Sequence, residues 1–468
     1  MKWYVISILF LSALCHFIFF GHPPEVVFDE VHFGRFSSAY ETGEFFFDIH
    51  PPLGKLLIST AGHVSGFEAT SMNYDTIGNS FTDSGYVWYR ILPILSGLFL
   101  PLVIFFLCLK LSFSKHAALF AALAVIFENS LLVQSRFIFL DSFLLLFGFS
   151  ALLFYFTSRN SSLIRPARFN YLLSAIFVGL AVSVKWTGLS FLAIIILVET
   201  WRLIRNIKDW SVWKKWIYRI FSLLGIVFVV YYIIFAIHFT LLSKSGTGDA
   251  FMSAEFQKTL IGSKYESLSD IKSKGMPSKF IELNIEMYKA NKNLTATHDY
   301  SSKWYSWPFM QRPIYYWVAS DDSATGVKDE VKTESKIYLL GNPLVYWSGA
   351  ISVVLLALTL IFRHPSLRDK KDRRVGLLLL FGFLINWLPF ALIGRVMFLY
   401  HYLAALIFSI LIMAYLIDKI DERKTRLRVG IILIALFAIG FIFYSPLTYG
   451  LPMTPGEQEV RLIFNSWK

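Results

Sequence analysis

The stretch FDEVHFGRFSSAYETGEFFFDIHPPLGK, Phe28–Lys55, carries many of the ionisable residues on which the functional predictions for this chain depend. It follows the first apolar segment directly and lies between segments apolar enough to cross a membrane. It contains two adjacent acids and a His-Pro-Pro turn, and its notable ionisable residues are Asp29, Glu30, His32, Arg35, Asp48, His50 and Lys55. Acids and cations placed where a chain first leaves a bilayer indicate chemistry at a membrane surface.

The same stretch predicts two short helices at the membrane interface. Apolar residues from Phe28 to Tyr40 recur at roughly helical spacing with charged residues between them, as in a helix lying on a membrane. Pro51-Pro52 must end this helix because a helix does not run through two prolines. A second short helix is predicted from Leu53.

The composition of the whole chain is that of a polytopic membrane protein. Hydrophobic residues make up 56% of 468 positions and charged residues only 16%. The mean hydropathy is +0.56, whereas soluble domains are about 45–50% apolar and about 25% charged. The excess lies in runs of roughly 20 residues, the length that crosses a bilayer. Because lipid satisfies no backbone polar group, the predicted fold class is all-α.

About eleven membrane spans are predicted from these runs. Their expected ranges are 3–20, 86–109, 116–133, 137–157, 169–185, 187–204, 218–241, 338–362, 375–394, 400–417 and 429–446. We expect a single membrane domain over 1–468, with 338–446 as its C-terminal transmembrane helices. The loops 21–85 and 242–336 are its two hydrophilic segments, and the second holds a potential glycosylation acceptor at Asn293-Leu294-Thr295.

The basic residues give the orientation of the chain. Most Lys and Arg fall in alternate loops, within 110–115, 159–168, 202–219, 363–374 and 419–428. These loops lie on one side if the spans alternate, and the positive-inside rule makes that side cytoplasmic. The loops 21–85 and 242–336 are therefore predicted to be extracytoplasmic. The net charge of +12 is explained by these loops, and no basic folded module that would bind nucleic acid is visible.

Further polar residues lie at the predicted extracytoplasmic ends of spans. They occur in QSRFIFLD, SVKWTG and GRVMFLYHY, and they are Arg136, Asp141, Lys185, Arg395, His401 and Tyr402. Charges near membrane depth mark function by default. Two acids with several cations suit transfer from an anionic lipid-linked donor, since cations hold the phosphate while an acid takes the acceptor proton.

Each candidate also has a structural alternative. Asp29-Glu30 also suits a helix start, and Arg136 and Asp141 also suit a buried ion pair. Snorkelling anchors are the alternative for Lys185 and Arg395, and a hydrogen bond to a backbone carbonyl is the alternative for His401. The aromatic cluster at 303–317 equally fits interfacial packing. Convergence on one side of the membrane favours function.

The chain resembles the protein O-mannosyltransferase family at these residues. The resemblance covers nearly the whole chain in order, through FDEVHFGRF, GEFFFDIHPPLGKLL, QSRFIFLD, SVKWTGL, WYSWPFMQRPIYY, GNPLVYW and GRVMFLYHYLAAL. It implies a GT-C glycosyltransferase fold, a dolichyl- or polyprenyl-phosphate mannose donor and Ser or Thr hydroxyls of proteins as acceptors. It also places the acidic pair at the catalytic centre and matches Arg136 to an arginine important for activity.

The resemblance leads to the following expectations for the site and its setting. The predicted catalytic residues are Asp29, as the base, and Glu30; the predicted donor-binding residues are His50, Lys55, Arg136, Lys185, Arg395, His401 and Tyr402. No metal is assigned, although two acids near a phosphate leave room for a divalent ion. The loop 242–336 has no room for the β-trefoil MIR domain of eukaryotic members. A short, prokaryotic-type enzyme of the plasma membrane is therefore expected, with the endoplasmic reticulum membrane as the alternative and a dimer left open.

Two other function classes remain as alternatives at this point. A GT-C transferase that moves another lipid-linked sugar to a lipid or glycan acceptor would share most of these residues. A lipid or sugar transporter would place its ionisable residues near mid-membrane in broken helices. The clustering of these residues at the outer ends of the spans favours an enzyme.

Overall fold

Long apolar helices build most of the protein in the computed structural model, which describes residues 1–69, 72–319, 333–365 and 369–468. Small parts of the two predicted loops (70–71 and 320–332) and of the basic loop 363–374 (366–368) lie outside the described residues. Within the described ranges, nine helices are long and apolar enough to cross a membrane, and a bent helix pair makes a tenth. The apolar helix α1 is shorter, with 16 residues.

Each of the eleven predicted spans has a helical counterpart. The helices are α1 (Lys2–Phe17), α4 (Val87–Lys110), the bent pair α5 (Lys115–Ile126) and α6 (Asn129–Arg136), α7 (Asp141–Asn160), α8 (Ile164–Val184), α9 (Leu189–Arg205), α10 (Trp210–Leu241), α13 (Pro343–Ile361), α14 (Lys370–Ile385), α15 (Leu403–Asp418) and α16 (Arg423–Tyr449). The protein is therefore a multi-pass integral membrane protein with a mostly helical fold.

The span predicted at 116–133 is not straight. α5 and α6 meet at an angle of 57°. The buried Glu128 lies at the break, where its carboxylate accepts hydrogen bonds from the backbone N–H of Leu131 and from the Ser130 hydroxyl, both at 2.7 Å. It also accepts one from the backbone N–H of Asn342 at 2.8 Å. A side chain that satisfies the first N–H groups of α6 starts a new helix there.

The two short helices predicted on either side of the double proline are present, and their place at the membrane interface stays a prediction. α2 (Glu30–Thr42) ends at Gly43 and α3 (Leu53–Ser65) ends at Gly66. Both glycines are in the left-handed region, with φ of 76° and 75°, which a glycine adopts without steric penalty. The double proline separates the two helices as expected.

The segment 242–336 contains more structure than its sequence indicated. It holds α11 (Ala254–Gln257), α12 (Met276–Asn293), the 3₁₀-helix η5 (Trp304–Phe309) and strand β1 (Ile314–Val318). β1 pairs antiparallel with β2 (Glu334–Leu339), which in turn pairs antiparallel with β3 (Pro452–Met453). Since β2 occupies part of the span predicted at 338–362, that helix starts later, at Pro343. The last helix, α17 (Pro455–Arg461), follows β3.

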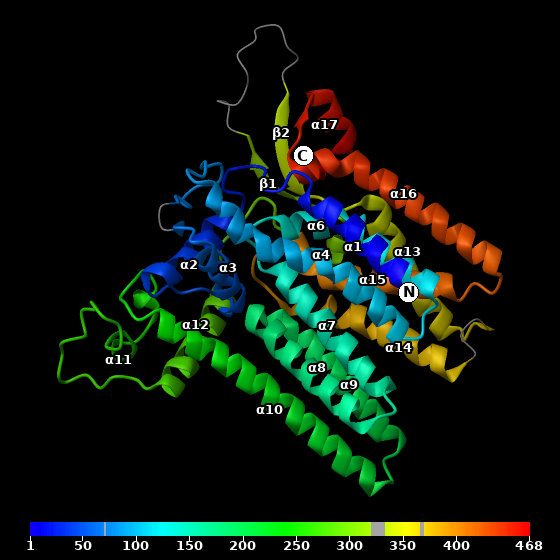
Figure 1. The fold of residues 1–468 in the computed structure, drawn as a ribbon, viewed down its shortest axis with the longest axis horizontal. Coiled ribbons are helices and arrows are strands. Elements are labelled where there is room, and N and C mark those ends of the chain that lie inside the picture. The colour runs from blue at the N-terminus through cyan, green and yellow to red at the C-terminus, as the bar shows by residue number, and fades with distance from the viewer. Residues whose placement is uncertain (70–71, 320–332, 366–368) are drawn as a thin grey trace.

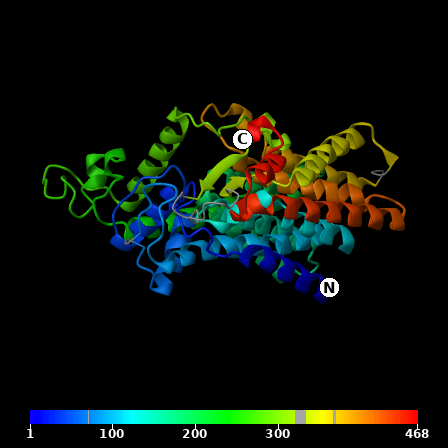
Figure 2. The ribbon, with the colours of Figure 1, turned by 90° about the horizontal axis from the view of Figure 1, so that it is seen from above.

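The long helices run side by side, and the short elements gather at one end of this bundle (Figure 1). α2, α3, α11 and α12 lie at that end, whereas the N-terminus lies at the opposite end in both views (Figures 1 and 2). Nearly all of α15 is buried, and much of α10 is exposed. An exposed apolar helix surface suits contact with lipid. The ends of α7, α9, α14 and α15 meet near the short elements, and this meeting point holds the candidate site.

Candidate active site

A cleft opens where the ends of α7, α9, α14 and α15 face the turn between α2 and α3. It encloses about 780 Å³, counting space open to solvent. Four of the nine predicted site residues line it, namely His50, Lys185, Arg395 and His401. They come from three segments that are far apart in the sequence, since Arg395 and His401 share one, and they bring two cationic side chains and two imidazoles to one place.

Lys185 is fixed in this cleft by Asp141. Its Nζ atom donates to the two carboxylate oxygens of Asp141 at 2.8 and 2.9 Å. Asp141 accepts a further hydrogen bond from Gln134 Nε2 at 2.7 Å, and the Tyr316 hydroxyl donates to Gln134 Oε1 at 2.7 Å. The ammonium also lies 5.1 Å from the ring centre of Tyr400. Lys185 is therefore fixed by a buried ion pair and an aromatic ring, and its predicted donor-binding role stays a prediction.

Asp29 is half-buried at the start of α2 and is not among the residues that line the cleft. Among the described residues, none donates a hydrogen bond to its carboxylate or forms an ion pair with it. The charges of Lys185, Asp141 and Asp48 nevertheless act on it. Burial raises the pKa of the Asp29 carboxyl to about 7, while the charge of Lys185 opposes that rise. A free carboxylate that titrates near neutral pH is suited to accept a proton.

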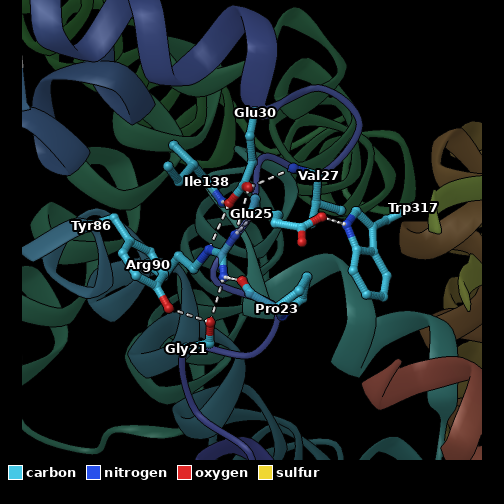
Figure 3. A network of polar contacts seen from close by, with 9 residues as sticks. All are labelled: Gly21, Pro23, Glu25, Val27, Glu30, Tyr86, Arg90, Ile138 and Trp317. Carbon is cyan, nitrogen blue, oxygen red and sulfur yellow. Dashed lines mark hydrogen bonds and ion pairs between the residues drawn. The ribbon is translucent and has the colours of Figure 1, made fainter. Parts of the chain in front are cut away.

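Glu30 has very different surroundings from Asp29 (Figure 3). It is fully buried, and Arg90 donates to both of its carboxylate oxygens, at 2.8 and 2.7 Å. The backbone N–H groups of Val27 and Ile138 donate to the same two oxygens at 2.8 and 2.9 Å. Both carboxylate oxygens of Glu30 are therefore bound by groups of the protein itself. This geometry supports a role for Glu30 in fixing the start of α2.

Arg90 also fixes the segment that precedes Glu30 (Figure 3). Its guanidinium donates to the backbone carbonyls of Gly21, Pro23 and Glu25 at 3.0, 2.7 and 2.8 Å. The segment that leads from α1 to Asp29 is therefore wrapped around one buried cation. Nothing in the local sequence around Arg90, inside an apolar run, indicated this partner.

Arg136 does not pair with Asp141 and does not line the cleft. Its guanidinium donates to the carbonyls of His16, Ile18 and Phe19 at 3.0, 2.9 and 2.6 Å. It lies 4.7 Å from the ring centre of Tyr449. These contacts close the C-terminal end of α1, where helix carbonyls lack partners. Its predicted donor-binding role stays a prediction, and the alternative of a pair with Asp141 is wrong.

Lys55 stabilises the His-Pro-Pro turn through contacts within the protein. It forms a buried ion pair with Asp48 and donates to the carbonyl of His50 at 2.8 Å. Its ammonium also lies 5.9 and 5.8 Å from the ring centres of Phe36 and Phe46. Lys55 thus lies behind His50, which faces the cleft. Burial, joined by the charges of Lys185, Lys55, Arg395 and His401, lowers the pKa of His50 well below its usual range, so its imidazole is neutral near pH 7.

His401 and Tyr402 differ although they are adjacent. The His401 ring lines the cleft, and its Nδ1 lies 2.9 Å from the carbonyl of Phe398. This is the backbone contact that the sequence left as an alternative, and it leaves Nε2 available to the cleft. Tyr402 is fully buried against Tyr346 and Phe383 and does not line the cleft.

Some cleft residues carry no signal in the sequence. Asn291 comes from α12 and Asn386 from the end of α14, and both add polar groups to the cleft wall. Gln134 and Tyr316 complete the support of Lys185 without reaching it directly. Only the polar character of Gln134 within an apolar run hinted at such a role. Within the described ranges, no group of three or more His, Cys, Asp or Glu side chains is close enough to hold a metal ion.

Comparisons with known proteins identify the family. A family profile described as dolichyl-phosphate-mannose-protein mannosyltransferase matches residues 6–243. A second, described as the C-terminal four TMM region of protein-O-mannosyltransferase, matches residues 276–467. The chain is 35% identical over 267 residues to dolichyl-phosphate-mannose–protein mannosyltransferase 4 of Candida albicans, covering 54% of this chain and 35% of the relative. It is 35% identical over 272 residues to protein O-mannosyl-transferase 2 of Danio rerio, covering 56% and 36%. The match thus spans about a third of the length of these curated relatives.

Solved structures share the fold. The S. cerevisiae protein O-mannosyltransferase Pmt1-Pmt2 complex bound to the sugar donor aligns with a TM-score of 0.90 at 22% identity, covering 100% of this chain and 92% of that chain. ArnT from Cupriavidus metallidurans bound to undecaprenyl phosphate aligns with a TM-score of 0.56 at 15% identity, covering 96% and 77%. The predicted GT-C fold is confirmed. Because the first profile alone matches just over half of the residues, the chain belongs to the dolichyl-phosphate-mannose–protein mannosyltransferase family.

Proposed function

We propose that this protein is a glycosyltransferase that transfers mannose from a dolichyl- or polyprenyl-phosphate mannose donor to Ser or Thr hydroxyls of proteins. The relatives named above are mannosyltransferases, and one solved neighbour is described as bound to the sugar donor. The observation that carries the proposal is the Asp29 carboxylate, free of side-chain partners in the described part of the chain and subject to the charge of Lys185 at a cationic cleft.

In the proposed reaction, the acceptor hydroxyl oxygen bonds to the anomeric carbon of mannose as the bond from that carbon to the phosphate oxygen breaks. The hydroxyl proton passes to Asp29, since a Ser or Thr hydroxyl is a poor nucleophile while it keeps its proton. The polyprenyl phosphate leaves with the electron pair of the broken bond. A single displacement of this kind inverts the configuration of the sugar.

The cleft supplies charge for the leaving phosphate. Lys185 and Arg395 are the cationic side chains that line it, and we assign the phosphate to them. His50, kept neutral, can donate one hydrogen bond to the donor, and His401, whose Nδ1 faces the Phe398 carbonyl, can accept one at Nε2. Because Lys185 is already held by Asp141, little reorganisation is needed when the phosphate arrives. This assignment uses only side chains of the protein at the phosphate and includes no divalent ion.

The assignment of acceptor separates this proposal from its main rival, a GT-C enzyme that glycosylates a lipid or glycan. The test uses membranes that contain the full chain, radiolabelled polyprenyl-phosphate mannose and a Ser/Thr-rich peptide, with a lipid acceptor assayed in parallel. We expect label on the peptide that is lost with Asp29→Asn and kept with Asp270→Asn, an exposed acid in the large loop. Label on the lipid acceptor alone would overturn the protein-acceptor assignment. The choice between a prokaryotic plasma membrane and the endoplasmic reticulum, and the dimer, stay predictions.

A further inference from the structure

A second cavity opens at the other end of the helix bundle. It is lined by the ends of α4, α7, α9 and α14 and encloses about 1860 Å³, counting space open to solvent. Asp141 lines the candidate active site and Asn160 lines this cavity, and they are the two ends of the 20-residue helix α7. At a rise of 1.5 Å per residue the two cavities are roughly 30 Å apart. The basic loops place this end on the cytoplasmic side.

Among the residues that the structure describes, six cations line this second cavity and no acidic side chain does. They are Lys110, Arg159, Arg202, Arg205, Lys371 and Arg374. Arg159 approaches Glu199 at 3.8 Å. The side chains of the other five form no ion pair or hydrogen bond with any residue of the described ranges. Like charges gathered without partners repel one another unless an anion lies between them.

The walls of the cavity are apolar and partly exposed. Leu197 and Trp201 lie one turn apart on α9 and are 36% and 50% exposed. Leu377 and Phe381 lie one turn apart on α14, and Leu377 is 41% exposed. Residues four apart share one face of a helix, so each helix presents an apolar strip to the cavity.

The cations and the apolar strips follow the same order on both helices. On α9, Arg205 comes one turn after Trp201, toward the cytoplasmic end. On α14, which runs in the opposite direction, Arg374 comes before Leu377 and is again nearer the cytoplasmic end. Charge therefore lies at the membrane surface and apolar surface lies deeper. A phospholipid has the same order, with a phosphate at the surface and acyl chains below it.

From this arrangement we infer that the cavity binds an anionic glycerophospholipid of the cytoplasmic leaflet. The phosphate lies among the six cations, and one acyl chain lies along the strips of α9 and α14. Basic pockets between transmembrane helices on the cytoplasmic side suit lipid head groups of this kind. A soluble anion would use the cations but would leave the apolar strips without a role.

Basic residues on the cytoplasmic side are expected in any membrane protein because they set orientation. Arg165 and Arg168 provide a matched comparison. They lie near the start of α8, on the same predicted side of the membrane as the cavity, and they are exposed. They do not line this cavity. Replacing them changes the net charge by the same amount as replacing two cavity cations.

The test is a titration of the purified full chain in detergent, followed by native mass spectrometry. Phosphatidylserine and phosphatidylcholine with identical acyl chains are compared on the wild type, on Arg205→Gln/Arg374→Gln and on Arg165→Gln/Arg168→Gln. One cation near a lipid surface contributes about fivefold in affinity, so loss of two should weaken phosphatidylserine binding by about 25-fold. The comparison variant should bind as the wild type does. If the first variant fails to fold, Arg202→Gln/Lys371→Gln removes two other cavity cations.

A second arm separates a lipid from a soluble anion. Trp201→Gln should weaken phosphatidylserine binding, and inorganic phosphate at millimolar concentration should displace little of the bound lipid. Equal weakening by Arg205→Gln/Arg374→Gln and by Arg165→Gln/Arg168→Gln would mean that general surface charge, and not this cavity, attracts the lipid. That result would overturn the inference. Full displacement by inorganic phosphate together with no effect of Trp201→Gln would also overturn it, since the site would then recognise a free anion.

Discussion

Asp29 and Glu30 are neighbours in the chain, yet they meet different chemistry. Glu30 accepts hydrogen bonds from Arg90 and from two backbone N–H groups. No described residue donates a hydrogen bond to the carboxylate of Asp29. Adjacent residues on a helix point about 100° apart, so Glu30 can face the protein interior while Asp29 lies where the charges of Lys185 and Asp141 act on it. In the proposed function, Asp29 is the base and Glu30 is its support.

The pH dependence of transfer should follow Asp29. Burial raises the pKa of this carboxyl to about 7, and only the ionised form accepts a proton. We therefore expect the transfer rate to rise with pH through about 7 and to level off above it. Asp29→Asn should lower turnover by about 10²–10⁴-fold, the usual contribution of a positioned base. The measurement is the pH–rate profile of peptide mannosylation, with donor binding followed separately. Near-normal turnover of Asp29→Asn would remove Asp29 from the role of base.

Glu30→Gln should act through stability as well as through activity. The substitution leaves the charge of the buried Arg90 without a counter-ion, and breaking a buried ion pair destabilises by about 3–5 kcal/mol. We expect a clearly lower thermal unfolding midpoint in detergent for Glu30→Gln and little change for Asp29→Asn. A Glu30→Gln protein that is inactive yet fully stable would instead place Glu30 in the chemistry.

At the scale of elements, three cations at the end of the bundle that holds the cleft hold backbone segments together. Arg90 binds carbonyls of the segment that follows α1, Arg136 binds carbonyls at the end of α1, and Lys55 holds the turn between α2 and α3. Apolar packing alone does not fix such irregular segments, because their carbonyls need donors. These elements position the cleft residues without entering the cleft.

Arg136 gives a test of this division of roles. Arg136→Ala leaves the carbonyls of His16, Ile18 and Phe19 without their donor, and an unsatisfied buried group costs about 1–3 kcal/mol. Arg136→Lys keeps the charge but not the planar fork, so it should recover only part of the stability. Thermal unfolding in detergent and donor binding are measured on both variants. Loss of donor binding by a fully stable Arg136→Ala protein would support the donor-binding prediction instead.

At the scale of the whole molecule, the bundle has a candidate site at each end. The cleft and the short elements α2, α3 and α12 lie at one end, and the cationic cavity lies at the other. The two ends are joined by α7, α9 and α14, each of which contributes residues to both cavities. An enzyme built in this way can take its donor on one face of the membrane while lipid on the other face supports the same helices.

The orientation of the chain can be tested with introduced cysteines. Ser269 lies exposed in the large loop, and Ser162 lies exposed in the turn between α7 and α8. A cysteine at 269 should react with a membrane-impermeant maleimide in intact cells or right-side-out vesicles, and one at 162 only after permeabilisation. The native Cys15 and Cys108 are buried and should give little background. Labelling of position 162 from the outside would invert the topology and with it the assignment of both cavities.

The sequence by itself determined the membrane spans, the two short helices around the double proline and the motif that carries the family resemblance, and it predicted the sidedness. These are local properties, since hydropathy, loop charge and proline breaks are set by residues near one another in the chain. It also drew attention to His50, Lys185, Arg395 and His401, the four predicted residues that line the cleft.

Only the tertiary structure decided which polar groups meet. Asp141 pairs with Lys185, 44 positions away, and not with Arg136 five positions away. Glu30 finds Arg90 at a separation of 60 residues, within an apolar run that gave no reason to expect it. The kink at Glu128 depends on Asn342 from a distant helix. Such pairings depend on how the helices pack, because a buried charge takes the partner that the surrounding helices bring within hydrogen-bond distance.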